Sequence, residues 1–194
     1  DIRRLFLVGS CPSEVIKLDL ANAAARLQGV HENRLRISAF SGSGIETTFT
    51  QGEDQCLASM VPDLPAAPEG AQRLMVVGTL ADIIEEQFRR HFAQLGITDV
   101  DFFPAARADD LPPVGPGTRV LLAQPYVSDT VTALCKRGAK LLSAPYPLGI
   151  EGTLAWFQAA AAEWGHSADA VHEALAIPMA RAQKSLAKVR ESLQ

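Results

Sequence analysis

The sequence predicts an α/β fold made of three-layer, Rossmann-like parallel sheets. Short apolar runs alternate with amphipathic stretches along the 194 residues, and this strand–helix alternation is typical of parallel sheets. The apolar runs are continuous, which indicates strands covered on both faces. The pattern restarts after a proline-rich segment, Pro62–Gly70, so the chain carries two copies of one architecture.

The first copy, residues 1–66, contains two predicted strands, Leu5–Val8 and Leu35–Phe40. Its other predicted elements are a helix from about Pro12 to Leu27, a turn at Ser41–Gly44, and a helix that ends near Val61 with Phe49, Cys56, Leu57 and Met60 on one face. Two strands are few for a free-standing domain. This part is therefore interpreted as the C-terminal part of a first α/β domain.

The second copy, residues 67–165, is predicted to be a second α/β domain. Its expected strands are Leu74–Val77, Val100–Phe103, Val120–Ala123 and Lys140–Leu142. Its expected helices are Leu80–Leu95, Ser128–Arg137 and Ile150–Trp164, with Trp156 and Phe157 placed in the core. Residues 166–194 are predicted to be a helical segment that leads to a further domain and is broken or kinked at Pro178.

Composition narrows the function classes. The chain has 18 Lys and Arg against 22 Asp and Glu, and the net charge of −4 argues against a broad basic face for nucleic acid. No apolar run is long enough to span a membrane. The sequence enters an apolar run at Leu5 without an initiator methionine or a signal-peptide pattern, so a cytoplasmic fragment is expected.

Cys11 is the sharpest candidate for a chemical role. It follows the predicted strand end at Gly9 and precedes Pro12, a residue favoured in the first turn of a helix. Ligands bind beyond the carboxyl ends of strands in open α/β sheets, and a helix start favours the thiolate, which binds iron or attacks electrophiles. A small buried residue at a tight turn explains the same pattern equally well. A [4Fe–4S] cluster needs four ligands, so Cys11 would be one among several.

Other candidates favour structural roles. Cys56 and Cys135 lie in the apolar stripes of their helices and are predicted to be buried thiols. The loop Ser41–Thr47 lacks the glycine and lysine spacing of phosphate-binding motifs, so a tight turn with close backbone approach is expected. Asp54 and its acidic neighbours are interpreted as partners of a helix dipole.

Two long segments carry a family resemblance. Leu7–Leu20 and Ser41–Asp54 are similar to signatures of the N-subunit family of light-independent (dark-operative) protochlorophyllide reductases, which resembles nitrogenase component 1. Shorter segments that fit are Val77–Asp82, Ala123–Tyr126 and Ala144–Gly152. The resemblance covers nearly the whole chain, and the form of the Ser41 loop is similar to that of anoxygenic phototrophic bacteria.

The resemblance implies an oxidoreductase subunit of (bacterio)chlorophyll biosynthesis that acts on protochlorophyllide and yields chlorophyllide a. In that family two N and two B subunits form a heterotetramer, and a separate homodimer, the L protein, uses ATP-Mg to deliver electrons. Each [4Fe–4S] cluster has three cysteines from the N subunit and an aspartate from the B subunit. Cys11 aligns with the most C-terminal of those cysteines, so the resemblance implies it as a metal and cofactor ligand. It implies no catalytic acid or base in this chain.

The nitrogenase comparison bears on the loop after Ala123. Pro125 stands where nitrogenase has a cysteine ligand to its cofactor, so a metal cofactor is not expected there, and Pro125-Tyr126 is expected to line a tetrapyrrole pocket. The alternatives are a chlorophyllide reductase, a nitrogenase-like scaffold subunit, or a non-catalytic module that binds a tetrapyrrole or metal chelate. The Ser41–Phe49 loop argues against the first two. The isolated chain is expected to be inactive.

Overall fold

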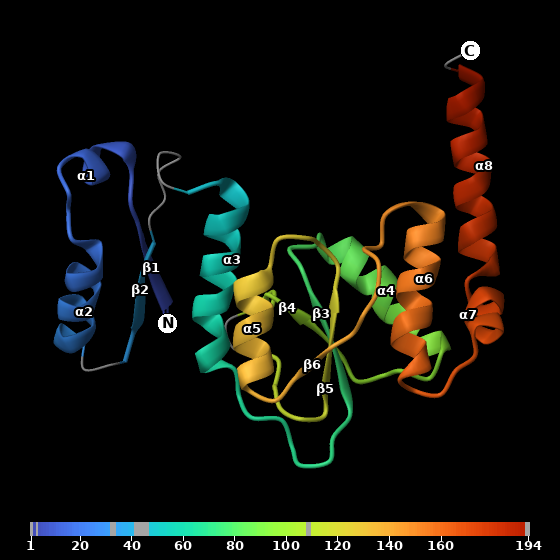
Figure 1. Cartoon of the computed structure of the whole chain (residues 1–194), viewed down its shortest axis with the longest axis horizontal. Helices are drawn as coiled ribbons and strands as arrows, with labels where there is room; N and C mark the ends of the chain where they lie inside the picture. Colours follow the sequence, from blue (N-terminus) through green and yellow to red (C-terminus); the bar gives the residue numbers. More distant parts are fainter. Residues whose placement is uncertain (1, 3, 32–33, 41–46, 108–109, 193–194) are drawn as a thin grey trace. The chain divides into compact units, whose positions relative to one another are not determined.

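The computed structural model confirms the α/β fold with parallel sheets (Figure 1). The residues that the structure describes are 2, 4–31, 34–40, 47–107 and 110–192. The chain divides into two compact units. Unit 1 comprises Asp1–Pro65, Ala105–Leu111 and Tyr126–Arg137. Unit 2 comprises Ala66–Pro104, Pro112–Pro125 and Gly138–Gln194.

Unit 1 is built on a pair of parallel strands. β1 (Arg4–Val8) pairs with β2 (Arg36–Phe40), in register from Arg4 opposite Arg36 to Val8 opposite Phe40. The described helices of this unit are α1 (Cys11–Val15), α2 (Leu20–Val30), α3 (Phe49–Met60), the 3-10 turn η1 (Val61–Asp63) and α5 (Ser128–Lys136). The Gly9 N–H donates to the Phe40 carbonyl at 2.8 Å. The turn that holds Cys11 therefore lies at the edge where the carboxyl ends of both strands meet.

The single helix predicted from Pro12 to Leu27 is wrong. The structure has two helices here, α1 and α2, and Lys17 between them has a φ of +53°. Asp19 begins the second helix, because its carboxylate accepts a hydrogen bond from the Asn22 N–H at 2.9 Å. An aspartate directly before a helical run is a helix-start signal that apolar periodicity alone overlooks.

Unit 2 is built on four parallel strands in the order β4-β3-β5-β6. Their bounds are β3 (Arg73–Val77), β4 (Val100–Phe103), β5 (Thr118–Leu122) and β6 (Lys140–Leu141). The described helices are α4 (Asp82–Gln94), α6 (Gly149–Ala162), α7 (Ala168–Ala174) and α8 (Ala176–Ser192). Together with α5, which belongs to unit 1, these elements confirm the strands and helices predicted between residues 67 and 165. The strand order reverses between β3 and β5, which makes that point a topological switch.

The predicted kink at Pro178 is wrong. The helical tail is interrupted at Leu175, between α7 and α8, and Pro178 lies in the first turn of α8. A proline there costs little, because the first N–H groups of a helix have no partner within the helix. No helix in the described part of the chain is both long and apolar enough to cross a bilayer.

Trp156 lies at the centre of the unit 2 core. Its side chain is fully buried, and its Nε1–H donates to the Leu122 carbonyl of β5 at 2.7 Å. Its ring centroid lies 4.8 Å from that of Phe88, 5.6 Å from that of Phe92 and 5.1 Å from that of Phe157. The prediction that Trp156 and Phe157 belong to the core, and not to a cofactor site, is confirmed.

Trp156→Phe should lower the free energy of unfolding by about 2–3 kcal/mol, because it removes the bond to Leu122 and leaves a cavity. Urea denaturation of the full-length protein, followed by circular dichroism, measures this loss. Trp164→Phe is the matched control, since Trp164 is only half-buried. Equal losses in the two variants would contradict the central role of Trp156.

Glu163 forms a small charge network in unit 2. Its carboxylate lies 2.9 Å from Arg119 Nε and 3.2 Å from Lys140 Nζ. The hydrogen bond from Lys140, followed by that from Arg119, lowers the pKa of Glu163 from its ordinary value. A carboxyl whose pKa is lower in the folded state stabilises the fold above its unfolded-state pKa, and this contribution is lost as the pH falls through the folded-state pKa.

Glu163→Gln should therefore lower the melting temperature at neutral pH. The difference from the parent should shrink as the pH falls into the acid range, because the parent then loses the same interaction. Melting temperatures across a pH series test this expectation. A difference that stays constant at all pH values would show that Glu163 acts through packing and not through its charge.

Candidate functional site

Cys11 is the first residue of α1, and its thiol is exposed and free. Two bonds fix the turn that presents it. Ser13 Oγ accepts from the Ser10 N–H at 2.7 Å, and the Glu14 N–H donates to the Ser10 carbonyl at 3.1 Å. The alternative of a small buried residue is therefore wrong. An exposed sulfur is the ligand type that iron–sulfur clusters use, so Cys11 fits as one ligand of such a cluster.

The other two cysteines differ from this pattern. Cys56, on α3, is half-buried, and burial raises the pKa of its thiol, although Arg4 acts in the opposite direction. Cys135 is exposed, so its predicted burial is wrong: α5 buries Thr130 and Leu134 instead.

Within the described ranges, no group of three or more His, Cys, Asp and Glu side chains could hold a metal ion.

Asp54 is a buried carboxylate that caps a helix other than its own. Its side chain belongs to α3 and is 5% exposed. Its two oxygens accept from the N–H groups of Asp129 and Thr130, each at 2.8 Å, and Oδ1 also accepts from the Thr130 hydroxyl at 2.6 Å. The N-cap position of α5, Val127, has no side-chain cap, so Asp54 replaces it.

This role corrects the interpretation of Asp54 as a simple dipole partner of its own helix. Asp54 shares one buried face with Leu57 and Val61, and a carboxylate on a buried helical face must be paired. The helical spacing of Asp54, Leu57 and Val61 was therefore the signal in the sequence for a buried and paired carboxylate. The partner could not be identified from the sequence, because Thr130 lies 76 residues further along the chain.

A cavity of about 410 Å³ lies at the starts of α3 and α5 in unit 1. Its lining is mostly polar and consists of Thr48, Thr50, Gln51, Asp54, Gln55, Tyr126, Ser128 and Asp129. Along the chain, α3 follows β2 and α5 follows β5, so each helix begins after the carboxyl end of a strand, the kind of position at which ligands bind in open α/β sheets. The predicted turn at Ser41–Gly44 lies outside the described residues.

Two aromatic side chains near these helix starts are exposed: Tyr126 lines the cavity, and Phe49 is the first residue of α3. Tyr126 is 71% exposed and has a φ of +65°, a backbone conformation that bulky residues rarely adopt. Phe49 is 84% exposed and lies between the lining residues Thr48 and Thr50. The prediction that Phe49 belongs to the buried face of its helix is wrong, since α3 buries its middle residues and Phe49 begins its first turn.

At the switch point of unit 2, Gln124 spans the carboxyl ends of β3 and β5. Its Oε1 accepts from the Thr79 N–H at 2.7 Å. The segments that follow β3 and β5 lie close together here: a Cβ added to Gly78 would lie 3.2 Å from the Cβ of Ala123. The crevice that holds ligands in other doubly wound sheets is thus bridged by a side chain here. Pro125, which follows, offers no side-chain ligand atom.

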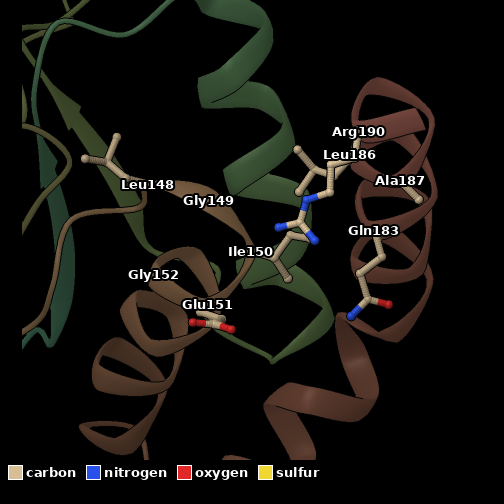
Figure 2. Close-up of a pocket in the computed structure, with 9 residues that line it drawn as sticks. All are labelled: Leu148, Gly149, Ile150, Glu151, Gly152, Gln183, Leu186, Ala187 and Arg190. Atoms are coloured by element: carbon tan, nitrogen blue, oxygen red, sulfur yellow. The ribbon is translucent and has the colours of Figure 1, made fainter. Parts of the chain in front are cut away.

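A larger and more open cavity of about 710 Å³ lies between the start of α6 and the end of α8 (Figure 2). Figure 2 shows Gln183 and Arg190 extending from α8 toward the first turn of α6. The lining residues include Ile150 and Glu151 from that turn. None of the predicted site residues lies in this cavity, so unit 1 holds the better candidate site.

Comparison with protein families decides the assignment. The model of the nitrogenase component 1 type oxidoreductases matches residues 1–194. The chain belongs to this family. The parallel sheets of both units agree with a nitrogenase component 1 type fold.

Curated members of the nitrogenase component 1 type family resemble the whole chain. Light-independent protochlorophyllide reductase subunit N of Halorhodospira halophila is 58% identical over 190 residues, which cover 98% of this chain and 45% of that protein. The proteins of the same name from Rubrivivax gelatinosus and Bradyrhizobium sp. (strain ORS 278) are 56% and 57% identical over 194 residues, again 45% of their length. The predicted resemblance is confirmed, and the chain spans about half the length of these relatives.

Proposed function

We propose that this chain forms part of the N subunit of a light-independent protochlorophyllide reductase, which converts protochlorophyllide to chlorophyllide a. The observation that carries the proposal is the identity of 54–58% to proteins of that name along nearly the entire chain. The free thiol of Cys11, at the carboxyl edge of the β1–β2 pair, supports it.

Cys11 provides one thiolate ligand to a [4Fe–4S] cluster in this proposal. The other ligands come from N-subunit sequence outside this chain and from an aspartate of a B subunit. When bound, the cluster accepts and passes on single electrons. Cys11 holds its sulfur at the start of α1, where the positive end of the helix favours an anionic ligand.

The proposed assembly contains two N and two B subunits and works in the cytoplasm. A separate L protein homodimer hydrolyses ATP-Mg and delivers the electrons. We assign residues 1–66 to the C-terminal part of a first domain and 67–165 to a second domain, and residues 166–194 lead to a third. Since Cys11 is a single ligand, the isolated chain neither holds the cluster stably nor reduces protochlorophyllide.

Reconstitution tests the proposal. The full-length protein is assembled with its B subunit and supplied with L protein, ATP-Mg, a reductant and protochlorophyllide. We expect ATP-dependent formation of chlorophyllide a, followed by absorbance spectroscopy. Replacing protochlorophyllide with chlorophyllide a in the same assay tests the alternative that the complex is a chlorophyllide reductase. Pigment binding without turnover, while the complex of a curated relative is active in the same assay, would favour a non-catalytic binding module and overturn the proposal.

A further inference from the structure

The outer half of α8 carries an apolar stripe that is exposed in the described part of the chain. We infer that this stripe is the docking surface for the next domain of the same N subunit, which meets it with an apolar patch rimmed by acidic side chains. The inference rests on the proposed function only in taking the chain as part of a longer N subunit.

Four apolar side chains recur along α8 at spacings of three, four and three residues. They are Met179, Ala182, Leu186 and Val189. This spacing places all four on one face of the helix, and it is the spacing of the seam along which a helix packs on a neighbouring element. The sequence of α8 therefore encodes one continuous contact face.

Only the first half of this face is used within unit 2. Met179 packs against the hydrophobic core of the unit, and Ala182 is half-buried. Further along, Leu186 is 50% exposed and Val189 is 54% exposed. Figure 1 shows the second half of α8 extending beyond α6 and α7. The second half of the stripe is thus an interaction face that continues an interface already formed.

A groove runs beside the exposed half of the stripe. A cavity of about 490 Å³ between α4, α6 and α8 is lined mainly by apolar side chains, among them Phe88, Leu154 and Leu186. It shares Gly149, Ile150 and Leu186 with the cavity of about 710 Å³ shown in Figure 2. Apolar side chains of a partner that enter this groove would be removed from water, which stabilises the contact.

The charges around the stripe indicate the chemistry of the partner. The basic side chains of α8 are Arg181, Lys184, Lys188 and Arg190, and its one acid is Glu191, whereas the whole chain has a net charge of −4. Figure 2 shows Arg190 extending from α8 toward the first turn of α6, at the groove. A basic rim around an apolar stripe is complementary to an apolar patch with acidic side chains at its edge.

The next domain of the same subunit fits this surface best. The chain covers 45% of the length of its curated relatives, so more than half of such a subunit lies outside it. In the proposed subunit α8 leads directly to a third domain. A domain joined to the end of α8 is held beside the groove at a high effective concentration, and consecutive parts of a chain are usually neighbours in space. In this arrangement α8 belongs to two domains at once.

Site-specific photo-crosslinking of the full-length N subunit, assembled with its B subunit, tests the inference. A benzophenone amino acid replaces Leu186, and the purified complex is irradiated. We expect a cross-link within one N subunit, from position 186 to residues beyond 194, identified by mass spectrometry of the peptides. A cross-link to the B subunit, to the second N subunit or only to residues before 194 would overturn the inference, as would the absence of a cross-link.

Lys184 is the matched control position. It is also exposed on α8 but lies about 200° around the helix from Ala182, and it lines neither cavity. The same benzophenone amino acid at position 184 should give no cross-link to residues beyond 194. An equal yield from both positions would show that the contact does not follow the stripe, and would contradict the inference.

Leu186→Asp gives an independent measurement. A charge within the contact should loosen the next domain, so a protease should cleave the assembled subunit beyond residue 194 about tenfold faster or more. Ala180→Asp adds the same charge to an exposed position of α8 outside the stripe, and it should change this rate less than about twofold. Equal rates for the parent and Leu186→Asp would overturn the inference. If Leu186→Asp does not assemble, the cross-link decides.

Neither measurement requires pigment or turnover. Failure of the proposed function, in which the complex makes no chlorophyllide, is therefore a separate result from failure of this docking surface.

Discussion

Replacing Cys11 with serine should leave the full-length protein assembled with its B subunit but without its iron–sulfur cluster. Cys11 presents an exposed, free thiol at the start of α1, and serine keeps its size but offers a hydroxyl that is a poor ligand for iron. Iron content and the electron paramagnetic resonance signal of the reduced cluster should fall by about a hundredfold or to background. Chlorophyllide formation should fall with them.

Cys135→Ser is the control for this experiment. Cys135 is also exposed and free, but it lies in the last turn of α5. Its replacement should leave iron content and turnover as in the parent. A normal iron content in the Cys11→Ser complex, shown to be intact by size-exclusion chromatography, would disprove the role of Cys11 as a cluster ligand.

Asp54→Ala should cause the largest loss of stability in unit 1. The change leaves the N–H groups of Asp129 and Thr130 without their acceptor, whereas the Thr130 hydroxyl keeps the Asp54 carbonyl as an acceptor at 3.1 Å. We expect the free energy of unfolding to fall by about 2–4 kcal/mol, since each of the two unpaired N–H groups costs roughly 1–2 kcal/mol. Urea denaturation of the full-length protein measures the change.

Two further variants sharpen this prediction. Asp54→Asn keeps one acceptor oxygen and should cost about half as much. Gln55→Ala is the matched control on the same helix, because Gln55 is exposed, and it should change the free energy of unfolding by less than about 0.5 kcal/mol. If Asp54→Ala were as mild as Gln55→Ala, the cap on α5 would contribute nothing to stability.

Much of the fold could be predicted because its signals are local. The continuous apolar runs at Leu74–Val77 and Val120–Leu121 are buried parts of strands, and the spacing around Trp156 places that ring in the core. The errors arose where apolar periodicity was the only guide. It joined α1 to α2 across Lys17, and it placed Phe49 on a buried face.

The candidate site was predicted less completely. The position of Cys11 at a strand end could be derived from the sequence, but its role as a ligand comes from the family resemblance. The role of Asp54 could not be derived, because it depends on a hydrogen bond to Thr130 across 76 residues. The exposed ring of Tyr126 depends on a positive φ, which no side-chain pattern encodes.

The capping of α5 by Asp54 has a consequence for how sequence can be exchanged between relatives. Residues 49–60 and 128–136 are distant in the gene, yet a carboxylate in the first segment satisfies the backbone of the second. A hybrid that inherits α3 from one parent and α5 from another must still place an acceptor opposite Thr130. Recombination points for designed hybrids are therefore best chosen so that both segments come from the same parent.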